Sequence, residues 1–279
     1  MKENIVLTIK GAFIGIANII PGVSGGTLAI TLGLYERLIG AISHFFKNLR
    51  ENIRLLIPIG IGAILAILLM SKLIGYSLDN YPVPTTIFFI GLILGGLPLL
   101  FRKTKKQYND VSNLITIVLA FSLVLIFTFF NSSNNNVNLT NLTIIEYIKL
   151  FLVGMIAAAT MVIPGISGSF ILMILGYYKP IISTIGSLTK FNNLFDNIII
   201  LIPFGIGIII GIVLISKIIE YLLKHFEIKT YYAIIGIVLA SILMIIKPLF
   251  ALNFDVIQLL IGIILGLIGC LIAYKLGDE

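Results

Sequence analysis

The sequence predicts an all-α polytopic membrane protein whose two halves form an inverted repeat. Three observations lead to this prediction. The composition is too apolar for a soluble protein, the first half of the chain recurs in the second, and each half carries the same Pro-Gly interruption within an apolar run. We therefore expect each half to consist of a re-entrant hairpin of broken helix followed by three transmembrane helices.

Composition predicts the membrane class. Of the 279 residues, 59% are hydrophobic and only 11% are charged, and the mean hydropathy is +1.13. Soluble domains carry about 25% charged residues, and several apolar runs here exceed the roughly 18 residues that span a bilayer. The N-terminal segment resembles a secretory signal, but the same pattern recurs at 153–170, so we expect it to be retained as structure.

Charge and cysteine content exclude other classes. The net charge of +7 is expected in cytoplasmic loops of a membrane protein rather than in a nucleic-acid interface. Cys270 is the single cysteine of the sequence, which excludes an intrachain disulfide and a metal site built on cysteines.

The chain repeats itself. Residues 11–42 align with 154–185, and residues 56–76 align with 201–221. The aligned blocks place Pro, Ser, Lys and Tyr in register, which apolar composition alone does not produce.

Each repeat is expected to hold one broken element and three continuous helices. We predict a first repeat at 1–135 and a second, inverted repeat at 142–279, joined by the uncharged, Asn-rich loop 131–141. The continuous helices are expected at 53–75, 84–101 and 113–130, and at 198–222, 230–247 and 256–274.

The distribution of positive charge favours hairpins over full crossings. If each broken element returns to its own side, thirteen of the 19 Lys and Arg residues lie on the side of the N-terminus and five lie opposite, with Arg37 within a hairpin. Cytoplasmic loops are enriched in Lys and Arg, so both termini are expected in the cytoplasm. Three crossings per half then turn the second repeat upside down, as in many secondary transporters.

The two interruptions are the candidate binding site. Proline cannot continue a helix, and glycine permits backbone conformations that other residues avoid. Unpaired N–H groups at membrane depth are tolerated where they line a cavity, and the positive end of a half-helix attracts an anion. The predicted site contains Pro21, Gly22, Ser24, Gly25, Gly26 and Thr27 from the first interruption, and Pro164, Gly165, Ser167, Gly168 and Ser169 from the second.

We expect these two segments to face one central cavity from opposite sides, with the Ser and Thr hydroxyl groups as further donors to phosphate or another anion. The alternative is that the interruptions only kink the helices and let them pack closely.

Four charged residues are further candidates. Glu36 and Arg37 follow the first interruption; Arg37 could bind a phosphate in a bidentate manner, and Glu36 could carry a coupling proton. Lys72 and Lys217 occupy matching Ser-Lys pairs and could draw an anionic headgroup into the cavity. The alternatives are an interfacial ion pair for the first two residues and helix-end snorkelling for the lysines.

The sequence shows no recognisable set of catalytic residues. His44 and His225 fall in expected loops, and no grouping of His, Asp, Glu and Cys has the spacing of metal ligands or of an acid–base pair. We expect no catalytic residues, no metal and no cofactor.

The paired motifs resemble those of the bacterial polyprenyl-phosphate translocases of the PopT type. The resemblance rests on Gly15-x-x-Asn18-x-x-Pro21-Gly22-Val23-Ser24-Gly25-Gly26-Thr27 with Gly33-x-Tyr35-Glu36, and on Pro164 to Phe170 with Gly176-x-Tyr178. It implies a multi-pass protein of the bacterial cytoplasmic membrane that returns undecaprenyl phosphate, or a related polyprenyl phosphate, from the outer to the inner leaflet for carrier-lipid recycling in cell-wall synthesis.

The residues themselves leave alternatives open. A channel or exchanger for small anions would use the same helix-end physics, and a membrane enzyme acting on lipid phosphate is a third hypothesis. A proton is the candidate coupling ion. We expect membrane lipid to surround the protein, and we expect no nucleic-acid partner.

Overall fold

The computed structural model describes residues 2–19, 23–104, 110–129, 137–139, 142–165, 167–188, 194–251 and 255–278, and this part of the chain forms helices without any strand. The first half holds α1 (Lys2–Ile19), α2 (Gly25–Thr31), α3 (Tyr35–Ser43), α4 (Leu49–Asn80), α5 (Pro82–Lys103) and α6 (Val111–Phe129). The second half holds α7 (Ile144–Val162), α8 (Gly168–Ile174), α9 (Tyr178–Leu188), α10 (Leu194–His225), α11 (Glu227–Ile246), the short 3-10 helix η1 (Lys247–Ala251) and α12 (Val256–Asp278).

The protein is an all-α polytopic membrane protein. Within the described ranges, six helices are long and apolar enough to cross a membrane, namely α4, α5, α7, α10, α11 and α12. Large apolar side chains such as Leu68, Leu69 and Leu271 are exposed on the outer faces of these helices, as expected for surfaces that contact lipid.

The continuous helices lie where the sequence places them, with two differences. α4 and α10 each have 32 residues, about 48 Å at 1.5 Å per residue, so both extend well beyond the predicted ranges 53–75 and 198–222. α7, which we expected to be an arm of the second hairpin, is itself long enough to span, whereas the described apolar part of α6 is shorter, at Val111–Ile126.

The first hairpin returns the chain to its starting side. α1 and α4 pack in parallel, because Gly11 lies against the backbone of Ile59 and Gly15 against that of Ala63, where a Cβ atom would come within 2.2 to 2.4 Å of the carbonyl oxygens. α4 starts at the same end of the molecule as α1. The segment formed by α2 and α3 must therefore bring the chain back to that end. In the second half, Gly154 lies in the same way against Phe204 of α10.

The turn within each hairpin has the same hydrogen bonds. Gly33 ends α2 with a φ of +70°, its N–H donates to Ile30 O at 2.9 Å, and the next N–H, of Leu34, donates to Ala29 O at 2.8 Å. Gly176 has a φ of +79° and closes α8 with the matching pair of bonds. This is the Schellman arrangement, which favours glycine because other residues avoid a positive φ.

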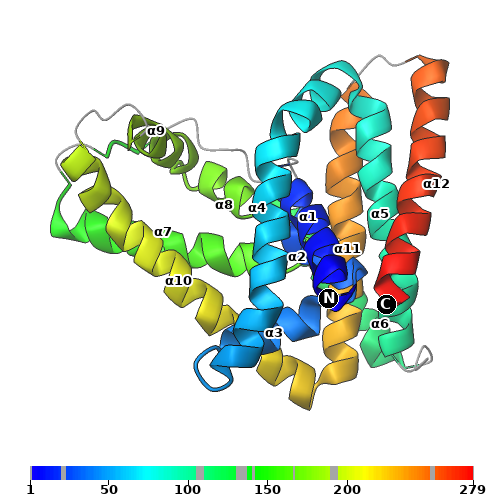
Figure 1. Ribbon diagram of the computed structural model, residues 1–279, viewed down its shortest axis with the longest axis horizontal. Coiled ribbons are helices and arrows are strands. Elements are labelled where there is room, and N and C mark those ends of the chain that lie inside the picture. Colours follow the sequence, from blue (N-terminus) through cyan, green and yellow to red (C-terminus); the bar gives the residue numbers. More distant parts are fainter. Residues whose placement is uncertain are drawn as a thin grey trace.

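The last helix of each half packs against a helix of the other half. α12 packs along α5, where Gly91 and Gly95 contact the backbone of Gly266 and Cys270, and α6 packs along α11. Figure 1 shows α5 and α12 descending while α11 rises beside them, with both termini at the lower end of the molecule.

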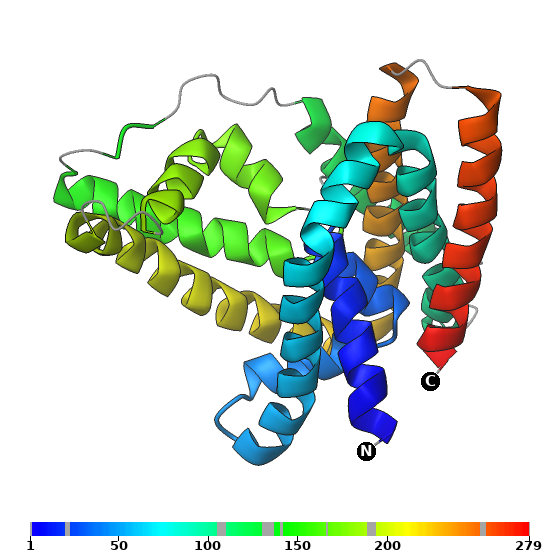
Figure 2. The ribbon, with the colours of Figure 1, turned by 45° about the horizontal axis from the view of Figure 1, so that its top comes forward.

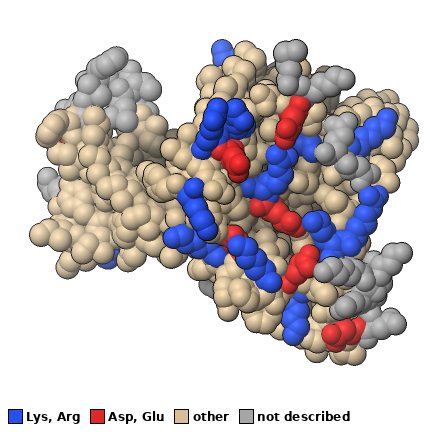
Figure 3. Space-filling model, turned by 60° about the horizontal axis from the view of Figure 1, so that its bottom comes forward, with Lys and Arg blue, Asp and Glu red and all other residues tan. Residues whose placement is uncertain are grey.

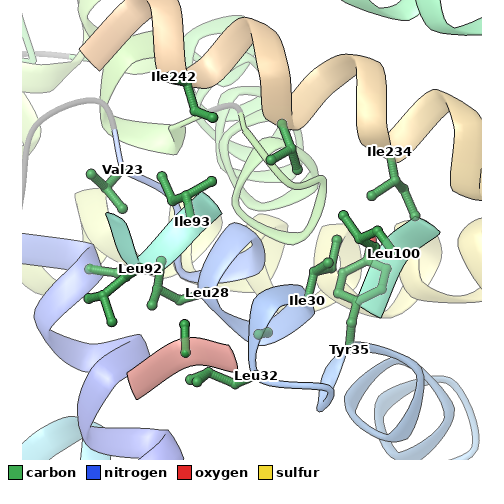
Figure 4. Close-up of a cluster of buried hydrophobic side chains, with 14 of the residues drawn as sticks. Val23, Leu28, Ile30, Leu32, Tyr35, Leu92, Ile93, Leu100, Ile234 and Ile242 are labelled. Atoms are coloured by element: carbon green, nitrogen blue, oxygen red, sulfur yellow. The ribbon is translucent and has the colours of Figure 1, made fainter. Parts of the chain in front are cut away.

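The two halves differ in how far they enter this bundle. α2 packs against α5 and α3 packs against α10, whereas α7, α8, α9 and the first part of α10 extend away from the bundle on the left of Figures 1 and 2. The main core therefore forms around the first hairpin. Figure 4 shows this core, in which side chains from α2, α3, α5 and α11 interdigitate, among them Leu28, Ile93 and Ile234.

Candidate functional site

The described residues of the first interruption, 23–27, are mostly buried, and two of their N–H groups have side-chain acceptors. Ser24 is the N-cap of α2, and its Oγ accepts a bond of 3.2 Å from the N–H of Gly26. The N–H of Gly25 donates to Asn18 Oδ1, on α1, at 3.2 Å. Pro21 and Gly22, which we also predicted to belong to the site, lie outside the described residues.

The second interruption differs from the first in its side-chain capping. Pro164 and Gly165 are buried after the end of α7, and Gly165 has a φ of +79°. Ser167 occupies the N-cap position of α8 without a side-chain capping bond; its Oγ instead pairs with Ser169 Oγ at 2.7 Å. The N-terminal end of α8 is therefore less satisfied by its own side chains than that of α2.

The two interruptions meet. The N–H of Gly165 donates a hydrogen bond of 2.8 Å to Thr27 Oγ1, which is buried. Three residues before Gly165, the carbonyl of Val162 accepts a hydrogen bond of 3.2 Å from Tyr35 Oη, at the start of α3. A Cβ atom on Gly26 would lie 3.1 Å from that same carbonyl oxygen, so glycine at this position allows the close approach. Residues 138 positions apart in the chain are thus joined at the centre of the protein.

This arrangement refines the predicted donor set. We expected the N–H groups of both interruptions to face a cavity, but those of Gly25 and Gly26 already have side-chain acceptors. Ser24 Oγ and Thr27 Oγ1 are acceptors in the bonds described above, which leaves their hydroxyl hydrogens unused by them, whereas the hydroxyl groups of Ser167 and Ser169 pair with each other at the start of α8. Gly168 is buried against α7, where its Cβ position lies 2.8 Å from Ala157 O.

Glu36 and Arg37 lie at the polar end of the first hairpin. Glu36 Oε1 pairs with Lys103 Nζ at 2.9 Å, and Arg37 Nη2 pairs with Glu3 Oε1 at 3.0 Å. All four side chains are about half exposed or more. Glu36 and Arg37 border a cavity of about 140 Å³ that also meets Tyr35, Lys103 and Tyr231.

Lys72 and Lys217 are exposed on α4 and α10, and the structure brings neither to the junction of the interruptions. Their neighbours differ: Ser216 is fully buried, and its hydroxyl has no partner among the described residues, whereas Ser71 is half-buried.

Charged side chains gather at one end of the molecule. Figure 3 shows Lys, Arg, Asp and Glu spread over the end of the bundle that comes forward in this view, while the protruding helices are almost uncharged on the same face. A cavity of about 490 Å³ opens there between α3, the start of α4 and the end of α10. A larger cavity of about 800 Å³ lies between α7, α9 and α10.

Two contributors were missed at the sequence level as site residues. Tyr35 recurs as Tyr178, but its role depends on the carbonyl of Val162, which lies in the other half of the chain. Asn18 does not recur, since Met161 takes its place in the second half, and it accepts from the N–H of Gly25 across the interruption. An Asn within an apolar run beside a helix break was the available signal for Asn18.

A polytopic helical membrane protein in which two interrupted helices meet at a buried centre has the architecture of a membrane transporter. Comparison with known proteins specifies the family. The family model described as undecaprenyl phosphate translocase-like (VCA0040-like) matches residues 14–250, and the chain belongs to this family.

Two curated relatives share one name. A polyprenyl-phosphate transporter of Staphylococcus aureus (strain NCTC 8325 / PS 47) is 33% identical over 272 residues, covering 96% of this chain and 94% of the relative. A polyprenyl-phosphate transporter of Vibrio cholerae serotype O1 (strain ATCC 39315 / El Tor Inaba N16961) is 29% identical over 248 residues, covering 84% of this chain and 75% of the relative. No solved structure matches the chain significantly.

Proposed function

We propose that this protein transports undecaprenyl phosphate, or a closely related polyprenyl phosphate, from the outer to the inner leaflet of the bacterial cytoplasmic membrane. The observation that carries the proposal is the bond between Thr27 and Gly165, because it joins two interrupted helices at the centre of a transporter fold. The family match and the names of the two relatives support the substrate class.

The physics of the substrate fits this centre. A polyprenyl phosphate has a charged head on a long apolar tail, and an isolated charge is costly within the hydrocarbon layer. Hydroxyl and backbone N–H donors can replace the water around the phosphate, while the tail stays in lipid. Ser167, Ser169 and the start of α8 are the donors we assign to this role, and Thr27 and Gly165 hold them beside the first hairpin.

Arg37 and the lysines have a different role in this proposal. Arg37 lies at the charged end, with Glu3 as its partner, so we assign it to capture of the headgroup near the membrane surface rather than to binding at the centre. Lys72 and Lys217 are exposed on their helices, where they would attract anionic headgroups.

We propose that alternating access arises when one inverted repeat, 1–135, rocks against the other, 142–279. The opposite directions of α5 and α11, and the matching turns at Gly33 and Gly176, support it. We orient the charged end with both termini toward the cytoplasm, because cytoplasmic segments are enriched in Lys and Arg. Glu36 is the proposed carrier of a coupling proton.

The test is a leaflet-resolved assay with undecaprenyl phosphate in proteoliposomes, run with and without a pH gradient. Arg37→Ala, and the pair Ser24→Val with Ser167→Val, should reduce translocation at least tenfold while the protein still inserts. Unchanged translocation in both variants would remove the proposed site.

The second candidate is a channel or exchanger for small anions. The specific observation in its favour is the 490 Å³ cavity at the charged end, which is lined by Arg37, Lys47 and Lys224. Flux of phosphate through the same proteoliposomes without movement of lipid would decide for it.

A further inference from the structure

The end of α3 is joined to α10 by polar contacts that cross between the two halves of the chain. Ser43 Oγ donates a hydrogen bond to Glu220 Oε2, and His44 Nδ1 lies 3.1 Å from the same oxygen. Lys224 Nζ lies 2.5 Å from the other carboxylate oxygen, Oε1. We call these four residues the Glu220 clasp.

Only the centre of the clasp, Glu220 and Ser43, is shielded from solvent, whereas the side chains of His44 and Lys224 are 41% and 62% exposed. The Glu220 side chain is 16% exposed, and Ser43 is buried beneath it at 7%. A carboxylate at such a position is costly unless both oxygens have partners, and here both do. Removing Glu220 therefore takes away the acceptor that α3 uses to hold α10.

The clasp has no counterpart in the second half. In the alignment of the repeats, Gly186 and Ser187 take the places of Ser43 and His44, while Gly75 and Asp79 take those of Glu220 and Lys224. In the described part of the chain, α3 packs extensively against α10, and α9 makes no comparable contact with α4. The chain can therefore fasten one hairpin in this way but not the other.

The two larger cavities occupy equivalent places in the two halves. The cavity of about 490 Å³ is bordered by His44, Glu51 and Asn52 of the first half, and the cavity of about 800 Å³ by the aligned residues Ser187, Asp196 and Asn197. Glu220 and Lys224 reach across the first cavity from the other half. The second cavity is lined entirely by its own half and by the segment that precedes α7.

We propose that the Glu220 clasp holds the first hairpin engaged with the second half and must open in each transport cycle, so that the two equivalent cavities open in turn. This inference rests on the proposed function, since a cycle of opening is required only of a transporter. Glu220 is a positioning residue, because it touches α3 rather than the substrate. The missing counterpart makes the clasped conformation the resting state.

Reversible crosslinking tests whether the clasp opens. Ser43→Cys and Glu220→Cys are combined with Cys270→Ala, and the two thiols are bridged by a short reducible bis-methanethiosulfonate reagent. Translocation of undecaprenyl phosphate should fall at least tenfold on bridging and return on reduction. A control pair, Ser77→Cys with Thr85→Cys, joins α4 to α5 within the first half and should translocate equally when bridged. Equal translocation by the bridged clasp would overturn the proposal.

Thiol labelling tests the clasp without any transport. Ala41, on α3, is 4% exposed and borders the first cavity, so Ala41→Cys reports on the release of the hairpin. Labelling by a water-soluble maleimide should accelerate at least fivefold with Glu220→Ala, and less with Glu220→Gln, which folds more readily because it keeps the shape. Glu51→Gln is the matched control, since Glu51 borders the same cavity without an ion pair among the described residues.

The two measurements separate the possible failures. If labelling does not accelerate with either Glu220 variant, the clasp does not hold α3 and the inference is overturned. If labelling accelerates but the wild-type protein moves no polyprenyl phosphate, the proposed function fails while the conformational role of Glu220 stands.

Discussion

Thr27 Oγ1 accepts a hydrogen bond of 2.8 Å from the backbone N–H of Gly165 and so joins the start of α2 to the turn that follows α7. Thr27 is 1% exposed, and the N–H of Gly165 comes from a residue with a φ of +79°. Since that N–H is buried, water cannot replace Thr27 as its acceptor. The Thr27 hydroxyl group therefore helps to fix the position of the second interruption relative to the first, together with the bond from Tyr35 Oη to the carbonyl of Val162.

Thr27→Val should loosen this junction. The substitution keeps the branched shape but removes the acceptor, and an unsatisfied buried donor costs about 1–3 kcal/mol. We expect a loss of that size in unfolding free energy in detergent, together with slower translocation. Thr27→Ser keeps the oxygen and should retain most of both properties; equal behaviour of the Val and Ser variants would contradict the role of the hydroxyl.

Glycine substitutions in α4 should separate into two classes. A Cβ atom on Gly62 would lie 2.0 Å from Thr8 O of α1, whereas Gly60, two residues earlier, has open space. Gly62→Ala should therefore destabilise the protein by about 1–3 kcal/mol through overpacking. Gly60→Ala should be neutral or stabilise it by up to about 1 kcal/mol, because alanine favours helix. Melting temperatures in detergent measure both.

The repeat predicts the same separation in α10. Gly207 would place a Cβ atom 2.1 Å from Phe151 O of α7, and Gly205 has open space. Gly207→Ala should thus resemble Gly62→Ala, and Gly205→Ala should resemble Gly60→Ala. A destabilising effect in one half without the other would show that the two helix pairs do not pack equivalently.

The two capping serines should differ in stability. Ser24 Oγ accepts from the N–H of Gly26, whereas Ser167 makes no capping bond and contacts Ser169 instead. Ser24→Ala should cost about 1 kcal/mol, the usual effect of losing an N-cap. Ser167→Ala should change the melting temperature less but reduce translocation more, since its hydroxyl is the one we assign to the phosphate. The reverse order would transfer that assignment to the first interruption.

The sequence predicted local features well because local patterns determine them. The Pro-Gly interruptions and the continuous helices depend on nearby residues or on apolar length, whereas the turns at Gly33 and Gly176 were not predicted. The side chains that satisfy the first interruption were not anticipated, because Asn18 acts across a break in the helix. The contact of Ser43 with Glu220 spans 177 residues and breaks the repeat, so neither periodicity nor internal alignment could indicate it.

Glu36→Gln tests whether a proton moves through this carboxylate. Glu36 pairs with Lys103 at 2.9 Å, and both side chains are nearly half exposed. Exposed ion pairs contribute at most about 1 kcal/mol, so the variant should fold normally and any effect on transport is functional. We expect translocation that no longer accelerates under an imposed pH gradient. Glu3→Gln, which removes the comparable exposed pair with Arg37, should still respond to the gradient. A wild-type-like response of Glu36→Gln would assign the coupling to another group.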